Sequence, residues 1–121
     1  MLNGKLDIFE RTKQFALQII SLYSALPKTM EAQVIGKQIL RSGTSLGAHV
    51  REGKRSRSDA EMVSKVEVGL QELEETMYWL ELLADSGIVK ADRLSDLMKE
   101  ADELTAILVT SAKTIKGRKP K

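Results

Sequence analysis

The sequence predicts an all-α protein, folded as an antiparallel up-down bundle of four helices in a single domain over residues 1–121. Hydrophobic residues make up 42% of the chain and charged residues 30%, whereas aromatic residues make up 4% and there are two prolines. This composition is typical of a globular helical protein and disfavours a sandwich or barrel. Four successive segments repeat apolar residues every three or four positions, as amphipathic helices in a bundle do. Turn signals at Pro27, Gly53 and Gly87 separate them, and the basic residues 117–121 form a short tail.

The first helix is predicted to run from about Asp7, a suitable N-cap, to Leu26, because Pro27 cannot continue a helix. Its apolar stripe consists of Ile8, Thr12, Phe15, Ile19, Leu22, Tyr23 and Leu26.

The second helix is predicted to start after the cap residue Thr29 and to end at Gly53. Its apolar stripe consists of Ile35, Ile39, Leu46 and Val50. Gly43 and Gly47 flank this stripe one turn apart, and a glycine inside a helix costs about 1 kcal/mol relative to alanine. We therefore expect a neighbouring helix to approach the second helix closely at these two positions.

The third helix is predicted to begin at a capping box, Ser58-Asp59-Ala60-Glu61. The Ser58 hydroxyl accepts the Glu61 amide, and the Glu61 carboxylate reaches back to the Ser58 amide. The main stripe of this helix is Met62, Val66, Gly69, Leu73, Thr76 and Leu80, and Gly87 ends it. The fourth helix, from about Ala91, carries a heptad seam of Leu94, Leu97, Ala101, Leu104, Leu108, Ser111 and Ile115.

Several classes of protein are disfavoured by what the sequence lacks. There is no cysteine, so disulfides, thiolate–zinc sites and a cysteine nucleophile are unavailable. The N-terminal residues do not resemble a signal peptide, and no segment approaches 18 uncharged apolar residues. Glycine-rich phosphate loops of the Walker or Rossmann type do not occur. The sequence therefore predicts a cytoplasmic protein without a cofactor.

The net charge of +2 conceals an uneven distribution along the chain. Residues 37–65 carry seven basic and three acidic side chains, residues 66–110 carry three and eleven, and residues 113–121 carry five and none. Such a distribution predicts one basic side suited to polyanions and one acidic side suited to a different partner.

The second helix is predicted to present a basic outer face. Helical projection gathers Lys37, Arg41, Arg51 and Arg55 in one arc opposite the apolar stripe, with no acidic residue of that helix inside the arc. A phosphate backbone can approach such a face closely, although an exposed charge run is more often merely solvated. We predict binding of nucleic acid, RNA rather than DNA, by nine residues: Lys37, Arg41, Arg51, Lys54, Arg55, Arg57, Lys116, Arg118 and Lys119.

Two further surfaces suggest protein partners. Val68, Trp79 and Leu82 lie off the apolar stripe of the third helix, and large apolar residues on an outer face predict an oligomer interface. The acidic third and fourth helices support an alternative function as a scaffold or accessory subunit that engages a basic partner such as a polymerase. Salt dependence distinguishes the two functions, because nucleic-acid binding weakens steeply as salt rises.

The only histidine, His49, is not predicted to be catalytic. It projects to the border of the apolar stripe, and although Ser45 lies one turn before it, no acid is evidently placed to orient the imidazole. A di-iron bundle needs Glu-x-x-His on two helices, which this chain lacks. All-α ribonucleases of the HEPN type place a histidine four to six residues after an arginine, and the spacing from Arg41 to His49 does not fit, so a metal-independent ribonuclease stays a minor alternative. We therefore predict no enzymatic activity, no catalytic residue and no metal site.

Two motifs resemble a known bacterial family. RSGTSLGAHVREG at 41–53 and ELEETMYWLELLADSGI at 72–88 resemble the four helix bundle proteins, also called 23S rRNA intervening-sequence proteins, and the resemblance extends from about Ile8 to Leu108. It implies a left-handed antiparallel bundle that assembles into a ring-shaped homopentamer, and it implies no catalysis. The family is similar in fold to the accessory variability proteins of diversity-generating retroelements, which are basic pentamers that bind nucleic acid and a reverse transcriptase.

The family pattern Ser-x-x-Ala-x-x-x-Glu-Gly falls on Ser45, Ala48, Glu52 and Gly53 of this chain, and its aromatic motif falls on Tyr78 and Trp79. Where the family usually has asparagine, this chain has His49, which makes a mild pH dependence possible near the normal titration range of histidine. Genes of the family often lie inside rRNA insertions, which is consistent with an association with RNA.

Overall fold

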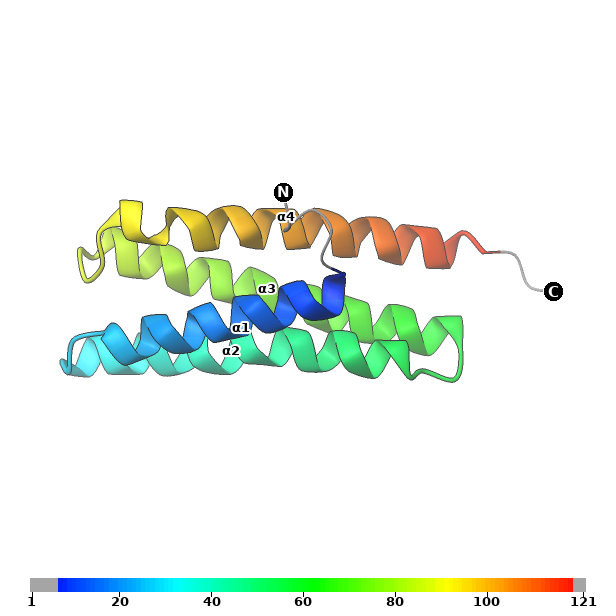
Figure 1. Cartoon of the computed structure of the whole chain (residues 1–121), viewed down its shortest axis with the longest axis horizontal. Helices are drawn as coiled ribbons and strands as arrows, with labels where there is room; N and C mark the ends of the chain where they lie inside the picture. The colour runs from blue at the N-terminus through cyan, green and yellow to red at the C-terminus, as the bar shows by residue number, and fades with distance from the viewer. Residues whose placement is uncertain (1–6, 119–121) are drawn as a thin grey trace.

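The structure, a computed structural model, describes residues 7–118, which form four helices in chain order: α1 (Ile8–Ala25), α2 (Met30–Lys54), α3 (Asp59–Asp85) and α4 (Ala91–Lys116). Each helix runs opposite to the one before it (Figure 1). The described residues include no strand. The prediction of an all-α fold with four antiparallel helices is therefore confirmed, and the helix ends agree with the predicted ends to within two residues.

The predicted caps of the first three helices form because side-chain oxygens take up amides that have no partner within the helix. The bonds run from Glu10 N to Asp7 Oδ1 (2.8 Å), from Ala32 N to Thr29 Oγ1 (3.3 Å) and from Glu61 N to Ser58 Oγ (3.1 Å). One half of the predicted capping box is wrong. The Glu61 carboxylate accepts the amide of Arg57 at 3.4 Å instead of the amide of Ser58.

A single apolar core runs along the bundle axis, and its largest fully buried side chains come from all four helices, among them Phe15, Ile39, Leu80 and Leu104. The seam of α4 departs from prediction at one position, because Ala112 is buried in place of Ser111. Ser111 is half-buried and its hydroxyl donates to the Ile107 carbonyl oxygen at 2.9 Å. A helix with 3.6 residues per turn drifts away from a strict seven-residue repeat, which moves the buried position by one residue.

The glycines of α2 face α1, as predicted. A Cβ atom at Gly43 would lie 2.8 Å from Cγ1 and 3.0 Å from Cγ2 of Ile19, and one at Gly47 would lie 3.3 Å from Oγ1 of Thr12. Ile19 is branched at Cβ and fully buried, so it has little freedom to move away. Close contact between the two helices thus requires glycine at position 43.

Substitution by alanine is expected to have opposite effects on the free energy of unfolding at two buried glycines. Gly43→Ala should lower the free energy of unfolding by about 1–2 kcal/mol, because overpacking outweighs the gain in helix propensity. Gly69→Ala should raise it by about 0.5–1 kcal/mol, because a Cβ atom there would make only ordinary contacts, the nearest at 3.5 Å from Leu46 Cδ1. Urea denaturation of both variants measures the difference, and equal changes of the same sign would contradict the close approach at Gly43.

A buried pair of hydroxyls fixes the register between α2 and α3. Ser42 Oγ and Thr76 Oγ1 lie 2.7 Å apart, and both residues are fully buried. Thr76 Oγ1 donates to the Glu72 carbonyl oxygen at 2.8 Å, so the shared proton comes from Ser42. Sliding one helix along the other would strand these hydroxyls without partners. This register also sets which charged residues of the two helices meet on the surface.

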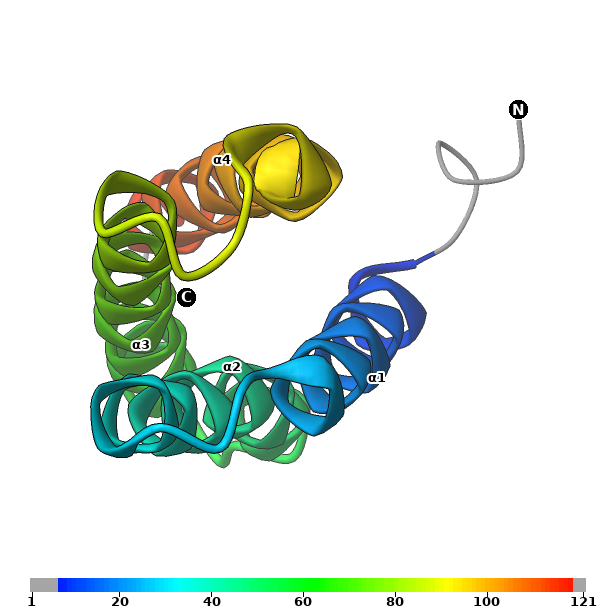
Figure 2. The ribbon, with the colours of Figure 1, turned by 90° about the vertical axis from the view of Figure 1, so that its left-hand side faces the viewer.

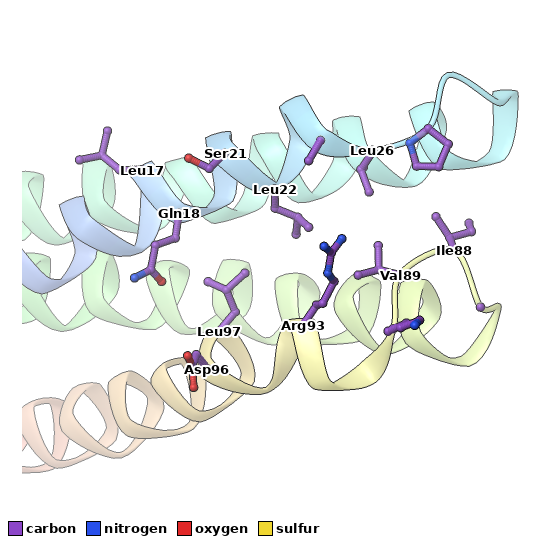
Figure 3. Close-up of a pocket in the computed structure, with 14 residues that line it drawn as sticks. Leu17, Gln18, Ser21, Leu22, Leu26, Ile88, Val89, Arg93, Asp96 and Leu97 are labelled. Carbon is purple, nitrogen blue, oxygen red and sulfur yellow. The ribbon is translucent and has the colours of Figure 1, made fainter.

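The bundle is least closed between α1 and α4. These helices touch less than any other adjacent pair, and Figure 2 shows the wider separation. A groove of 1070 Å³ lies between the C-terminal half of α1 and the N-terminal half of α4. Figure 3 shows Leu22 and Leu97 turned into this groove and Arg93 reaching across it from α4. Beyond the groove, Arg11 of α1 binds Glu100 and Glu103 of α4 and holds the two helices together.

Candidate nucleic-acid interface

Most of the predicted basic residues lie at one end of the bundle. The end of α2, the turn into α3 and the end of α4 meet there (Figure 1). Two ion pairs join the start of α3 to the end of α4, from Arg118 Nη1 to Asp59 Oδ1 at 3.1 Å and from Lys116 Nζ to Glu67 Oε2 at 2.7 Å. Short turns place these segments together, although they are far apart in the sequence.

Four residues from the end of α2 and the turn into α3 carry uncompensated positive charge, and we call them the basic end: Arg51, Lys54, Arg55 and Arg57. All four are exposed, and none forms an ion pair with another residue in the described range. Their position at the C-terminus of α2 is electrostatically favourable, because the helix dipole places partial negative charge there. Lys54 also lies over the ring of Phe9, with Nζ 4.7 Å from the centroid. The basic end is therefore an accessible cluster of cations.

Lys37 is also exposed and unpaired among the described residues, and it lies on the same outer side of α2. It precedes Arg51 by 14 positions, which corresponds to about 21 Å along a helix at 1.5 Å per residue. Lys37 therefore belongs to the predicted face but lies well away from the basic end.

Arg41 is not free, which corrects the expectation of an arc without acids. Its Nη1 lies 3.1 Å from Glu72 Oε2 and its Nη2 lies 2.7 Å from Glu75 Oε1. The hydrogen bond to Glu72 raises the pKa of Arg41 above its ordinary value. Both carboxylates come from α3, whereas the helical projection considered acids of α2 alone. The charge of Arg41 is thus largely neutralised within the chain.

The C-terminal part of the predicted face is similarly compensated. Lys116 and Arg118 are held in the ion pairs with Glu67 and Asp59, and Lys119 lies outside the described residues. Of the nine predicted contact residues, three are therefore ion-paired.

His49 lies where the sequence predicts, at the edge of the core, with 26% of its side chain exposed. Two carboxylates flank it, which the sequence analysis did not anticipate: Glu52 Oε1 is 3.5 Å from Nδ1, and Glu72 Oε2 is 3.7 Å from Nε2. Nδ1 is buried and has no hydrogen-bond partner among the described residues. The hydroxyl of Ser45 donates to the Arg41 carbonyl oxygen at 2.7 Å. That hydrogen bond uses the only proton of the serine, so Ser45 is not activated by the imidazole.

Glu52 is held chiefly by Lys65, at 3.0 Å between Oε1 and Nζ. This hydrogen bond lowers the pKa of Glu52. Glu52 therefore stays ionised beside the basic end, and Lys65 offsets its charge.

The three residues predicted to form an oligomer interface, Val68, Trp79 and Leu82, are half-buried. Trp79 packs partly against the core and meets the ring of Tyr78 edge-on, with centroids 5.1 Å apart. The large apolar residues that are most exposed were not predicted as interface residues: Met30 (82%), Val34 (58%), Tyr78 (54%), Leu17 (47%), Ile20 (44%) and Val109 (37%). Helical projection, applied to the other helices as it was to the third, would have identified most of these residues as lying off the apolar stripes.

None of the helices within residues 7–118 combines the length and the apolar character that crossing a bilayer requires.

The chain is similar to known proteins over nearly its full length. The family described as "23S rRNA-intervening sequence protein" matches residues 4–110. A crystal structure from Bacteroides thetaiotaomicron VPI-5482, described as a protein with unknown function from the S23 ribosomal protein family, shares 34% sequence identity with a TM-score of 0.84. That similarity covers 88% of this chain and 99% of the other. No curated protein matches the sequence. Neither of the two descriptions names a catalytic activity. The four helices and the extent of these matches lead to one conclusion: the chain belongs to the 23S rRNA-intervening sequence protein family.

Proposed function

We propose that this protein is a non-enzymatic, cytoplasmic protein that binds nucleic acid, RNA in particular, through phosphate contacts at its basic end. The observation that carries the proposal is the group of four exposed and unpaired cations between Arg51 and Arg57. Arg41 of α2 and Lys116 of α4, by contrast, are paired with carboxylates. Unpaired lysine and arginine side chains attract phosphates and release the counterions that surround them.

Recognition of a particular base sequence is not part of this proposal. Reading single-stranded bases requires accessible aromatic rings or edge-directed hydrogen bonds near the bound strand. The ring of Phe9, beside the basic end, is covered by Lys54. Tyr78 and Trp79 lie in the other half of α3, away from its first turn at Asp59. The basic end therefore suits contacts to the RNA backbone.

Assembly into a ring-shaped homo-oligomer, a pentamer by resemblance, is the second part of the proposal. Met30 and Val34 of α2 are exposed, and the register in which Ser42 lies opposite Thr76 places Val34 opposite Ala84, within one turn of Leu82. An interface along these residues would repeat the basic end around the ring and raise avidity without new contacts. A monomer in multi-angle light scattering at micromolar concentration would refute the assembly while leaving the RNA proposal standing.

The RNA proposal is tested by measuring binding to a single-stranded RNA at increasing salt. Each phosphate contact to a single strand contributes about 0.7 to the slope of log K against log salt, so four contacts per subunit predict a slope of about −3. A double-stranded DNA of equal length provides the comparison for the preference for RNA. If neither nucleic acid is retained at low salt, the protein does not act through its basic end.

A further inference from the structure

A second groove lies on the outer seam between α3 and α4, away from the basic end. Its volume is 590 Å³. Leu70 and Met77 of α3 are partly buried against the core and form its apolar base, together with Val109 of α4. Tyr78, with 54% of its surface exposed, forms part of the wall. Exposed apolar surface of this kind, bordered by polar residues, marks sites of protein contact.

The rim of this groove is negatively charged on both sides. Glu74 and Glu81 line it from α3 and Asp102 lines it from α4, and all three are exposed. None of them forms an ion pair within residues 7–118, and no basic residue lines the groove. Five other carboxylates of these two helices are compensated from within the chain: Glu67, Glu72, Glu75, Glu100 and Glu103. Asp85, Asp92 and Asp96 also have no ion pair within residues 7–118, but they do not line this groove. The groove is distinguished by three unpaired carboxylates that border an apolar base, an arrangement that suits a basic partner.

The spacing of the groove residues suits a helix as the occupant. Leu70, Met77 and Glu81 recur at helical intervals along α3 and span about 16 Å at 1.5 Å per residue. A straight seam between two antiparallel helices receives the apolar face of a third helix, whose side chains at positions i, i+3, i+4 and i+7 insert between them. That length corresponds to three turns of the incoming helix.

We infer that this groove binds a basic amphipathic helix of a partner protein. The apolar stripe of that helix contacts Leu70, Met77 and Val109, and lysine or arginine side chains on both flanks of the stripe pair with Glu74, Glu81 and Asp102. The same carboxylates repel nucleic acid. A neutral or acidic helix would cover the apolar base of the groove but leave these carboxylates partly desolvated and without a cation, which is unfavourable. The inference does not depend on RNA binding, because it concerns different residues on a different part of the surface.

Trp79 offers a fluorescence readout, since it is the only tryptophan and its ring meets that of Tyr78, which lines the groove. The probe is a synthetic helical peptide about four turns long, made of leucine and lysine so that the leucines form one stripe with lysines on both flanks. We expect this peptide to change the emission of Trp79 in a saturable way. A peptide of the same composition without the stripe, and one with glutamate in place of lysine, should not do so.

Charge reversal locates the binding site. Glu74→Lys/Glu81→Lys should weaken binding of the lysine peptide at least about tenfold, a loss of about 1.4 kcal/mol. The matched control, Glu31→Lys/Asp92→Lys, makes the same change of net charge at exposed residues outside the groove and should alter affinity less than about twofold. Circular dichroism verifies that both variants remain folded.

Three results would overturn the inference. The scrambled peptide binding as well as the striped one would indicate attraction by charge alone. Unchanged affinity in Glu74→Lys/Glu81→Lys would place the peptide elsewhere. Loss of self-association in that variant, seen by light scattering, would make a second copy of this chain the natural occupant. RNA retention should not fall in Glu74→Lys/Glu81→Lys, because the substitutions leave the basic end intact and add positive charge, so failure of this inference is distinguishable from failure of the proposed function.

Discussion

Replacing Arg51 and Arg55 together by alanine is expected to lower RNA affinity about tenfold near physiological salt. Both side chains are exposed on the outer side of α2, and neither pairs with a carboxylate in the described residues. Each is therefore available to displace counterions from one phosphate. Two lost contacts, at about 0.7 each in the salt exponent, account for a change of this size. Fluorescence anisotropy with a labelled single-stranded RNA measures it.

The matched control for this experiment is Lys28→Ala/Lys90→Ala. These lysines are exposed and unpaired in the described chain, and they flank the turns at the opposite end of the bundle (Figure 1). The net charge falls by the same amount as in Arg51→Ala/Arg55→Ala. We expect the control to change affinity less than about twofold, because exposed charges beyond the Debye length are largely screened. Equal losses in the two variants would show that overall charge, and not the basic end, controls binding.

Arg11→Ala is expected to lower the free energy of unfolding by about 3 kcal/mol, because it leaves the partly buried carboxylate of Glu100 without its cation. Only 8% of Arg11 is exposed. Its Nε and Nη2 donate to Glu100 at 3.0 and 2.7 Å, and Nη2 also donates to Glu103 at 2.9 Å. The hydrogen bond to Glu100 raises the pKa of Arg11 above its ordinary value, so the guanidinium stays charged at physiological pH. Since α1 and α4 otherwise touch little, the loss should loosen α1 selectively.

Urea denaturation measures the change in stability, and hydrogen exchange shows which helix is destabilised. The amides of α1 should lose protection before those of α2 and α3. Glu103→Gln is a suitable control, since 56% of the Glu103 side chain is exposed and an exposed ion pair contributes about 0.2–1 kcal/mol. If Arg11→Ala unfolds within about 0.5 kcal/mol of the unmodified protein, the change is that of an ordinary surface substitution and the clamp does not hold α1 to α4.

Local features of the fold were predictable because their causes lie within a few residues. Asp7, Thr29 and Ser58 cap the helices that they precede, and the glycines at 43 and 47 face a neighbouring helix. These signals depend on side chains within one turn of each other or on the period of a single helix.

The features that were not predicted depend on contacts between segments that are distant in the sequence. Arg41 is neutralised by Glu72 and Glu75, which lie more than 30 positions away, and Glu72 also lies beside His49. A projection of one helix identifies the face of a charge but not the acids that a neighbouring helix brings to it. The weak contact between α1 and α4 could not be predicted either, because an apolar stripe indicates burial but not how closely two helices pack.

The basic end is tested most directly by measuring log K for RNA against log salt for the unmodified protein and for Arg51→Ala/Arg55→Ala side by side. If these arginines contact phosphates, the slope of the variant should be shallower by about 1.4. Parallel lines with the same slope would mean that neither arginine touches the backbone, and would contradict the proposed mode of RNA binding.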